Sequence, residues 1–451
     1  MKVAKLAVRA VLVGGLLVGA ARAQSPGEQL PADPAHGYAQ AQDAAASPSD
    51  APGVASAESV GPSGRGVEPG VAVAESHWPS DLGGYYGSCP PHAGADEPFR
   101  IFGRHDSGIE VGGWISVGGY ANQFGESRNG PLGFNTVGDG VNVHQLWGYM
   151  AKETETHGLG ADWGARVDYV FGIDGPDTQA VGGTGWDSSW DTGRDYGSAI
   201  PQAYAEIAVN YLTVKAGYFF TPLGYERVQA PENFFYSHSY THYYVEPFTH
   251  TGALATYDGI EDWTFYGGWT TGWDAAWEMI GDSNMFLGGA TYHLGDDLAV
   301  TYMTSAGQLD SLAAGRGDVY MHSIVMELGL TERLDWIIQS DLHYRNGAER
   351  ELTAGGVNQY LLWTLNECWA FGFRFEWLYD RDGAFVSPGR AAGNFYNLTA
   401  GVNWKPHANV IFRPEVRYDW FSGTYAPGGL PFDAGRENEQ FSGGFDLIFL
   451  F

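Results

Sequence analysis

Apolar and polar residues alternate along much of this chain. In residues 159–171 one set of alternate positions is apolar or aromatic, and the other carries Asp162, Arg166 and Asp168. Side chains of a β-strand point alternately to its two faces, so this segment predicts a strand with one apolar and one polar face. The last segment, residues 441–451, has the same pattern, with Asp446 on the face opposite its aromatic row.

About sixteen such segments follow one another after residue 108. They are residues 109–120, 141–152, 159–171, 200–209, 212–220, 252–257, 262–271, 285–293, 298–306, 319–330, 334–345, 355–365, 368–379, 394–404, 408–420 and 441–451. Most are roughly 9–12 residues long, which suits a tilted strand that crosses a bilayer. The connections between them alternate between long and short. An even number of strands with alternating loop lengths predicts an all-β, antiparallel up-and-down transmembrane barrel.

The chain before the barrel has a different character. Residues 1–23 combine a basic start, an apolar run and an Ala21-Arg22-Ala23 cleavage site, which predicts a signal peptide that is removed on export. Residues 24–108 are rich in Ala, Pro, Gly, Ser and Asp and predict a low-complexity periplasmic linker. The barrel itself is expected to span residues 109–451. No apolar stretch approaches the length of a membrane-spanning helix.

Composition agrees with a barrel and excludes some functions. The chain has 65 Gly, 16 Trp, 26 Tyr and 24 Phe, a composition that favours strands and tight turns. Its mean hydropathy of −0.23 fits a protein that needs only one apolar face per strand. The formal charge of −29 argues against nucleic acid as a partner. A soluble β-propeller is the competing fold, but no repeat of propeller length recurs along the sequence.

Two cysteines, Cys89 and Cys368, leave two alternatives open. In an exported protein they can form one disulfide, which would tie the linker to the periplasmic rim of the barrel. They can equally remain unpaired.

The polar parity of the strands identifies residues expected to line the lumen. In residues 368–379 it carries Arg374 and Glu376, and in residues 408–420 it carries Arg413, Glu415, Arg417 and Asp419. Arg166, Asp168, Glu206, Lys215, Asp335, Asp341, His343 and Arg345 are also predicted to point inward. Regular charges of this kind indicate a wet interior. Two interpretations stay open: the arginines pair with neighbouring wall carboxylates, or they form one half of a constriction. Pro414 predicts a bulge or local irregularity, because it cannot donate a ladder hydrogen bond.

The third and longest connection, residues 221–251, is the candidate for the other half of such a constriction. It carries Glu226, Glu232 and Glu246. If it folds into the barrel it would face strands thirteen to fifteen, and its acidic residues would oppose the basic wall across an eyelet. A loop that lies outside the barrel would refute this hypothesis.

Other chemistry is weakly indicated. His238, His242, Glu246 and His250 recur at every fourth position, but Pro247 interrupts any helix there, so no metal site is predicted. No catalytic motif stands out, and neither an enzyme nor a cofactor is expected.

The motifs Pro222-Leu-Gly-Tyr-Glu226, Ala230-Pro-Glu-Asn-Phe234 and Pro247-Phe-Thr-His-Thr-Gly252 resemble a pattern of the OmpL-like β-barrel porins. The similarity runs from about residue 112 to the end of the chain. It implies an outer-membrane pore without naming a substrate. The resemblance points to Glu226, Glu232, Asn233 and His250 as loop or eyelet residues. The terminal Phe451 likewise resembles the signature that the bacterial barrel-assembly machinery reads.

The sequence thus predicts an exported porin of the outer membrane that lets small hydrophilic solutes or ions diffuse passively, surrounded by lipid. Porins of this size are often trimers, so a homotrimer is one candidate assembly. The alternative is a substrate-selective channel or a surface receptor for a ligand such as a sugar. Loop tryptophans would suit such a ligand, namely Trp186, Trp190, Trp273 and Trp277.

Overall fold

The computed structural model describes residues 108–138, 140–181, 187, 189–277, 279–311, 315–347 and 351–451. The predicted signal peptide and nearly all of the predicted linker therefore lie outside the described residues. So does Cys89.

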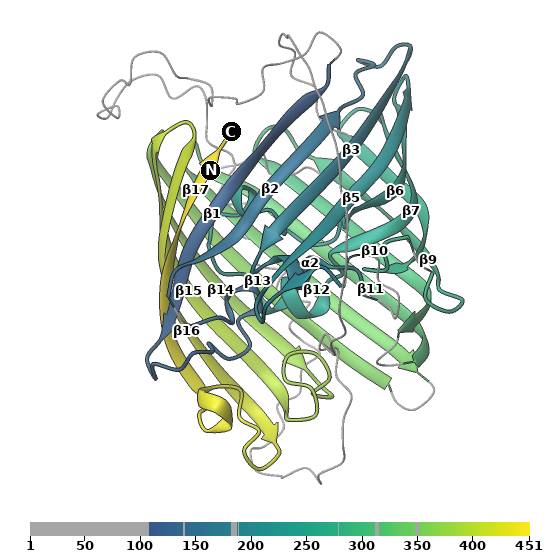
Figure 1. The fold of residues 1–451 in the computed structure, drawn as a ribbon. Coiled ribbons are helices and arrows are strands. Elements are labelled where there is room, and N and C mark those ends of the chain that lie inside the picture. Colours follow the sequence, from purple (N-terminus) through teal and green to yellow (C-terminus); the bar gives the residue numbers. More distant parts are fainter. Residues whose placement is uncertain are drawn as a thin grey trace, which may run out of the picture.

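Sixteen strands close into one antiparallel barrel, as predicted (Figure 1). They are β1 (Glu110–Asn122), β2 (Asn142–Lys152), β3 (Ala161–Gly172), β5 (Tyr196–Val209), β6 (Leu212–Phe220), β7 (Thr249–Ile260), β8 (Trp263–Trp273), β9 (Asn284–His293), β10 (Leu298–Ser311), β11 (Gly315–Thr331), β12 (Leu334–Gly347), β13 (Glu351–Asn366), β14 (Trp369–Asp380), β15 (Ala391–His407), β16 (Val410–Tyr425) and β17 (Glu439–Leu450). A seventeenth element, β4 (Asp191–Thr192), is a two-residue strand in a loop that pairs only with β5. Each barrel strand pairs with its neighbours in sequence, and β1 pairs with both β2 and β17.

The helices are short and belong to the connections. They are η2 (Gly133–Asn135), α2 (Gly175–Thr178), η3 (Ala230–Glu232), η4 (Thr241–Val245) and η5 (Asp433–Gly435). In the described part of the chain, no helix combines the length and apolar character needed to cross a membrane.

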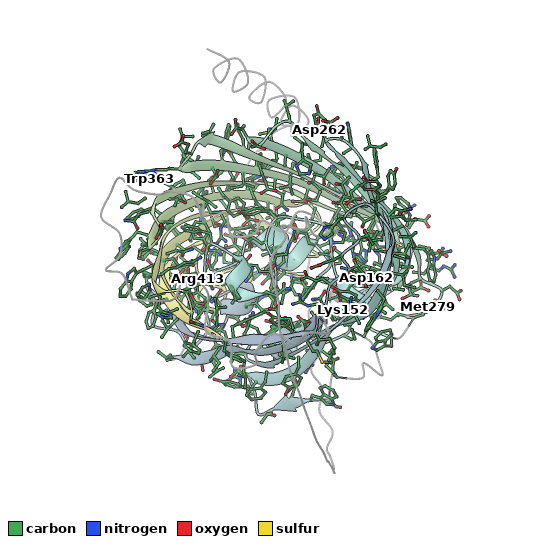
Figure 2. The ribbon with its side chains drawn as sticks, turned by 90° about the horizontal axis from the view of Figure 1, so that it is seen from above. Lys152, Asp162, Asp262, Met279, Trp363 and Arg413 are labelled. Carbon is green, nitrogen blue, oxygen red and sulfur yellow. The ribbon has the colours of Figure 1, made fainter. Side chains whose placement is uncertain are left out.

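The alternating pattern explains which side chains face outward. Trp163, Phe373 and Phe445 are exposed on the outer surface, whereas Asp168 and Arg374, on the other parity of their strands, are buried inside. Seen along the barrel, labelled Trp363 points away from the wall and Arg413 lies within the ring (Figure 2). A closed ring also satisfies the backbone hydrogen bonds that lipid cannot.

Two loops predicted to be long are short. Residues 307–318 and 346–354 were expected as long connections, but β10 and β11 remain paired as far as Ser311 and Gly315. β12 and β13 likewise pair out to Asn346 and Glu351. The apolar alternation fades where strands leave the hydrocarbon, yet backbone pairing continues into water, so the pattern underestimates strand length.

Pro414 interrupts the pairing between β15 and β16, but the register of the two strands is the same on both sides of it. Between β15 and β16, Gly401 pairs with Glu415 and Trp404 pairs with Phe412 in one register, and the shift falls later, between Trp404 and His407. Pro414 is therefore a local irregularity, as predicted. The register shift that a bulge would cause does not lie at Pro414 but between Trp404 and His407.

The interior is not uniformly polar. A large apolar cluster inside the barrel joins wall residues such as Leu287 and Met321 to the loop residues Leu223, Val245 and Phe385. Several of its members lie at the long-loop ends of the strands. Packed apolar side chains therefore fill part of the space that the alternating charges indicate to be wet.

Candidate functional site

The third loop, residues 221–248 between β6 and β7, lies inside the barrel (Figures 1 and 2). It carries η3 and η4 and contacts the inner wall at Gln339 of β12, Arg374 of β14 and Arg413 of β16. Residues 221–251 were predicted to enter the lumen near strands thirteen to fifteen, and the structure places the loop against this part of the wall.

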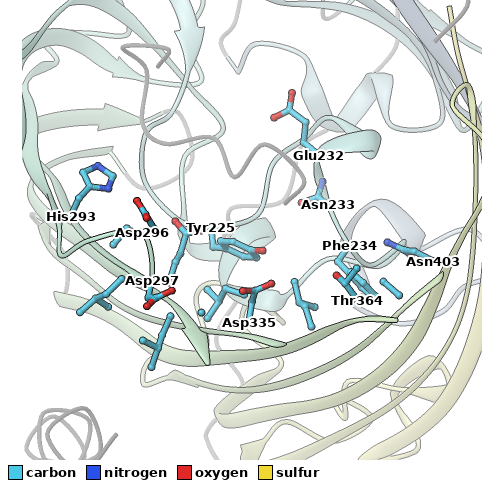
Figure 3. Close-up of a pocket in the computed structure, with 18 of the residues that line it drawn as sticks. Tyr225, Glu232, Asn233, Phe234, His293, Asp296, Asp297, Asp335, Thr364 and Asn403 are labelled. Carbon is cyan, nitrogen blue, oxygen red and sulfur yellow. The ribbon is translucent and has the colours of Figure 1, made fainter. Parts of the chain in front are cut away.

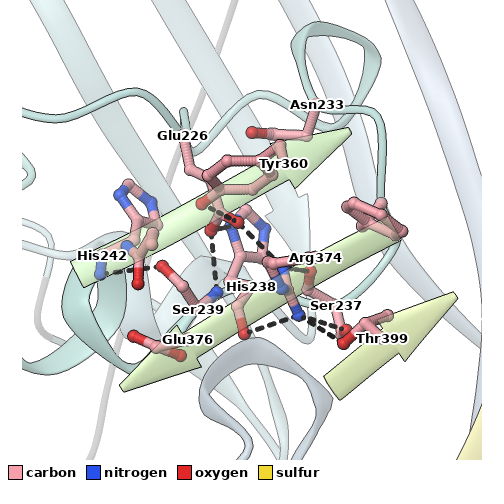
Figure 4. A network of polar contacts seen from close by, with 12 residues as sticks. Glu226, Asn233, Ser237, His238, Ser239, His242, Tyr360, Arg374, Glu376 and Thr399 are labelled. Carbon is pink, nitrogen blue, oxygen red and sulfur yellow. Dashed lines mark hydrogen bonds and ion pairs between the residues drawn. The ribbon is translucent and has the colours of Figure 1, made fainter. Parts of the chain in front are cut away.

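Glu226 and Arg374 form the centre of the contact (Figure 4). Arg374 Nη1 lies 2.8 Å from Glu226 Oε1, and both side chains are buried. Arg374 also donates from Nη1 to the Ser237 carbonyl at 2.6 Å. Tyr360 donates its hydroxyl to Glu226 Oε1 at 3.0 Å, and the Ser239 amide donates to Oε2 at 2.8 Å. The buried charge on each side is thus paired and hydrogen-bonded.

Arg413 holds a different part of the loop. Its guanidinium makes a two-point ion pair with Asp446 of β17, with distances of 2.8 and 2.7 Å. Nη1 then donates to the carbonyls of Ala230 and Asn233 at 2.7 and 2.6 Å. A planar guanidinium suits this role, because its five donors can serve a carboxylate and a backbone at the same time.

Wall carboxylates accept hydrogen bonds from the loop backbone. Glu376 receives the amides of Tyr240 and Thr241 at 2.8 and 2.7 Å. Glu415 receives the amides of Tyr236 and Ser237 at 2.9 and 3.1 Å. These bonds are charge-assisted and stronger than bonds between neutral groups.

Two of the three arginines pair with wall carboxylates, but only Arg417 does so with one of the expected partners, Glu376, Glu415 and Asp419. Arg417 pairs with Asp419 at 2.7 Å and also donates to the His238 carbonyl at 2.6 Å. Arg374 pairs with the loop, and Arg413 pairs with Asp446, so Glu376 and Glu415 are left to bind the loop backbone. Glu226 and Arg374 meet directly instead of facing each other across an opening.

Glu246 and His250 are buried at the carboxy-terminal end of the third loop, and His250 is the second residue of β7. Glu246 contacts His242 Nδ1 at 3.1 Å and accepts a hydrogen bond from Gln339. His250 Nε2 lies 3.0 Å from Thr221 Oγ1, which links the two ends of the loop.

Asn233 shapes the loop itself. Its side-chain oxygen accepts the Arg227 amide at 2.8 Å, and its Nδ2 donates to the Arg227 and Gln229 carbonyls at 2.6 and 2.9 Å.

Arg166 and Lys215 lie on β3 and β6, outside the arginine network. Arg166 pairs with Asp168 at 2.7 Å, and the Lys215 ammonium lies 4.2 Å from the centre of the Tyr204 ring. The structure therefore separates these two predicted lumen residues from the contact between the third loop and β14–β17.

The pKa of Glu226 reflects these contacts. Burial acts to raise this pKa, but Arg374 and His238 outweigh it, and the pKa of the carboxyl lies well below its ordinary range. Glu226 therefore carries its negative charge throughout the neutral range.

Glycines make room for the docked loop. Gly224 has φ +82°, and a Cβ built there would lie 2.2 Å from the Glu246 carboxylate. On the wall, a Cβ at Gly372 would lie 2.2 Å from the Phe234 ring, and one at Gly118 would lie 2.8 Å from the Tyr236 hydroxyl. Gly224 thus permits close packing within the loop, and Gly372 and Gly118 permit close approach between loop and wall.

Sequence reasoning missed several residues of the network. Asp446 was noted as the polar residue of the last strand but was not proposed as the partner of Arg413. Gln145, which donates to the Val228 carbonyl at 2.7 Å, and Tyr360 gave no signal beyond their inward parity. A search for polar residues at inward positions of neighbouring strands would have found Asp446.

The histidines of the third loop pack against each other. The rings of His238 and His242 stack with centroids 5.0 Å apart, and η4 ends before Pro247. Among the residues with described positions, no cluster of His, Cys, Asp and Glu is arranged to hold a metal ion.

Of the four loop tryptophans proposed for a sugar ligand, Trp273 is not accessible to one. Trp273 is part of β8, where its indole is buried, donates to Ser305 Oγ at 2.9 Å and packs edge-on against His343. Trp190 and Trp277 are exposed, and Trp186 lies outside the described residues.

Cys368 is buried beside the turn between β13 and β14 and is not a free thiol. Because Cys89 lies outside the described residues, the Cys89–Cys368 bridge stays a prediction.

A cavity of about 330 Å³ lies between the third loop and the short-turn ends of β9–β16 (Figure 3). Glu232 and Asn233 line it from the loop side. The lumen is therefore packed toward its long-loop end and hollow toward its short-turn end.

Comparison with known proteins agrees with this architecture. A family model described as "Putative beta-barrel porin-2, OmpL-like" matches residues 108–451. The chain belongs to this family of outer-membrane β-barrel porins. The match begins two residues before β1, so it covers the entire barrel.

Two solved channels share the fold at low sequence identity, and a third structure is similar in part. The anion-selective porin from Comamonas acidovorans is 9% identical with a TM-score of 0.50, and covers 76% of this chain and 99% of its own. The outer-membrane channel DcaP of Acinetobacter baumannii is 9% identical with a TM-score of 0.50, and covers 78% of this chain and 99% of its own. A trimer form of OmpT from Vibrio cholerae is also 9% identical, with a TM-score of 0.49, and covers 76% and 99%. No curated protein matches the chain significantly.

Proposed function

We propose that this chain is a passive porin that lets small hydrophilic solutes cross the outer membrane through the part of the lumen that its loops leave open. The observation that carries the proposal is the third loop, which lies inside a closed barrel and is fixed there by Arg374 and Arg413. Because paired charges hold the loop in one position, the loop narrows the pore to a constant width and does not move in and out of the open path. The cavity beside the loop, whose lining includes Glu232 and Asp335, supports a water-accessible path.

The same proposal includes how the protein reaches the membrane. Residues 1–23 direct export and are removed, and the aromatic terminus at Phe451 is recognised by the barrel-assembly machinery. A homotrimer is the assembly we propose for the mature protein, in keeping with its size.

Planar-bilayer recording of the purified, refolded barrel tests the proposal. Ohmic steps are expected, small for a barrel of sixteen strands because apolar packing fills part of the lumen. Liposome swelling should show entry of small sugars and exclusion of larger ones. A heat-modifiable barrel that gives no steps and admits no sugar would overturn the proposal.

A further inference from the structure

Two carboxyl groups that share one donor connect the carboxy-terminal end of the third loop to β12. Gln339 Nε2 donates to Oε1 of Glu246, which follows η4, and to Oδ2 of Asp341, which lies two positions further along β12. Since one nitrogen contacts an oxygen of each group, these two oxygens lie at most about 6 Å apart, two hydrogen-bond lengths. Loop and strand thus meet here through a pair of acids and not through an ion pair.

Both acids are buried without a cationic partner. Glu246 is 6% exposed and Asp341 is 4% exposed. In the described part of the chain, neither forms an ion pair with a Lys or an Arg. Glu246 Oε2 lies 3.1 Å from His242 Nδ1, but burial lowers the pKa of His242 to about 4, so this ring is uncharged at neutral pH. A negative charge at Glu246 therefore has no partner that offsets its loss of water.

The other charged groups around Glu246 act in opposing directions. Glu226 of the loop and Glu376 of β14 disfavour its ionisation, whereas Arg227 and the hydrogen bond from Gln339 favour it. His343 of β12 faces the adjacent loop carbonyl, with its Nδ1 3.4 Å away. Burial is the largest influence, and it raises the pKa of Glu246 to about 8. The docked loop end therefore favours the protonated carboxyl at neutral pH.

We propose that the contact between Glu246 and β12 is a pH-sensitive switch, in which the protonated carboxyl keeps residues 242–248 docked on the wall and rising pH loosens them. When this end is released, the carboxyl enters water and gives up its proton to solvent at its unperturbed pKa of about 4.3. Docking and ionisation therefore compete, and each pH unit above that value favours the released end.

The remainder of the loop stays in place over the same range. Glu226 ionises at a lower pH, and the guanidinium groups of Arg374 and Arg413 do not lose their protons. Release is therefore confined to the carboxy-terminal end. The inference rests on the proposed porin function only in its effect on the pore, where current noise should be larger at pH 9 than at pH 7.

Hydrogen exchange of the full refolded barrel in detergent, followed by mass spectrometry, tests the proposal without any need for conductance. The opening constant of residues 242–248 is the measured exchange rate divided by the intrinsic rate at each pH. It should rise by about tenfold per pH unit between about pH 5 and pH 8 and level off above that range. Residues 227–237 of the same loop should show no such rise.

Glu246→Gln removes the titrating group and keeps the shape of the side chain. Its opening constant for residues 242–248 should be independent of pH. The matched control is Glu261→Gln, which removes an exposed carboxylate in the turn between β7 and β8 and should keep the pH dependence of wild type. If Glu246→Gln does not fold, the comparison of the two loop segments in wild type decides.

Two results overturn the inference: an opening constant in wild type that does not depend on pH, or the same pH dependence in Glu246→Gln. Exchange and conductance also separate the two proposals. A conducting barrel with a pH-independent opening constant leaves the porin function standing and overturns this inference. A barrel that shows the predicted exchange but does not conduct overturns the porin function and leaves the switch in the loop standing.

Discussion

Arg374 illustrates how one residue can fix a loop. It is fully buried, and its guanidinium contacts the Glu226 carboxylate, the Ser237 carbonyl and the Thr399 hydroxyl. A buried ion pair adds little net stability compared with an apolar pair, but removal of one partner leaves the other charge without compensation. The strength of this contact is therefore best measured by breaking one side of it.

Arg374→Met should destabilise the barrel by about 3–5 kcal/mol, because Glu226 would remain buried and charged. Urea unfolding followed by heat modifiability measures this free energy. The double variant Glu226→Gln with Arg374→Met should recover part of the loss.

The control is Arg316→Met, which breaks an exposed pair with Asp282. Its cost should stay below about 1 kcal/mol. Equal losses of unfolding free energy in Arg316→Met and Arg374→Met would contradict the structural role of Arg374.

Gly224 provides a second test at the residue scale. Gly224→Ala should cost about 1–3 kcal/mol and displace the third loop, since φ is +82° and the new methyl group would collide with Glu246. Gly428→Ala is the matched control, because Gly428 has φ +71° with no atom within 4 Å of a built Cβ. Unfolding free energy and single-channel noise should change more for Gly224→Ala than for Gly428→Ala.

At the scale of the element, the third loop is held mainly by its backbone. Four of its amides, at residues 236, 237, 240 and 241, donate to wall carboxylates. One of the loop's own carboxylates, that of Glu226, pairs in the opposite direction with Arg374 of the wall. The wall thus supplies carboxylates that accept from the loop, and the loop supplies a carboxylate that binds the wall. The conformation of the loop therefore depends on the barrel that surrounds it.

Acid should release the loop only at low pH. The pKa of Glu226 is lower in the folded protein than its unperturbed value of about 4.3, so its contribution is complete above that value and is lost as pH falls through the lowered pKa. Channel noise should stay constant between pH 7 and pH 5 and increase below about pH 4. The Glu226→Gln variant should have a lower free energy of unfolding at pH 7, and its channel noise should lack this increase at low pH. Increased noise already at pH 6 in wild type would contradict the assignment.

At the scale of the whole molecule, the last residue completes the ring. β17 ends at Leu450, but Phe451 continues the pairing with β1, exchanging two backbone hydrogen bonds of 2.9 Å with Gly113. The aromatic ring of Phe451 also covers Gly113, where a Cβ would lie 2.9 Å from the ring. Closure of the barrel thus involves the same terminus that the proposed assembly signal occupies.

Phe451→Ala should lower the amount of barrel assembled in cell outer membranes several-fold while leaving refolding into detergent nearly unchanged. Phe449→Ala is the control, because Phe449 is an exposed aromatic residue of the same strand. Equal losses for both variants in cells would show that Phe451 acts only through its apolar surface.

Sequence alternation by itself determined the fold of the barrel. It predicted all sixteen strands, and the predicted bounds of β6 agree with the structure at both ends. The prediction succeeds because each strand must present one apolar face to lipid, which requires an apolar residue at every second position. It also predicted that Arg374, Arg413 and Arg417 point inward, since inward direction follows from parity alone.

Only the tertiary structure decided which of these inward groups meet. Arg413 pairs with Asp446, 33 positions later, and Arg374 pairs with Glu226, 148 positions earlier. Such partners are set by the barrel register and by the path of a loop that has no periodic pattern. The hollow at the short-turn end, with Asn403 opposite Asp296 and Asp297, likewise arises from packing between distant segments, so no local stretch of sequence encodes it.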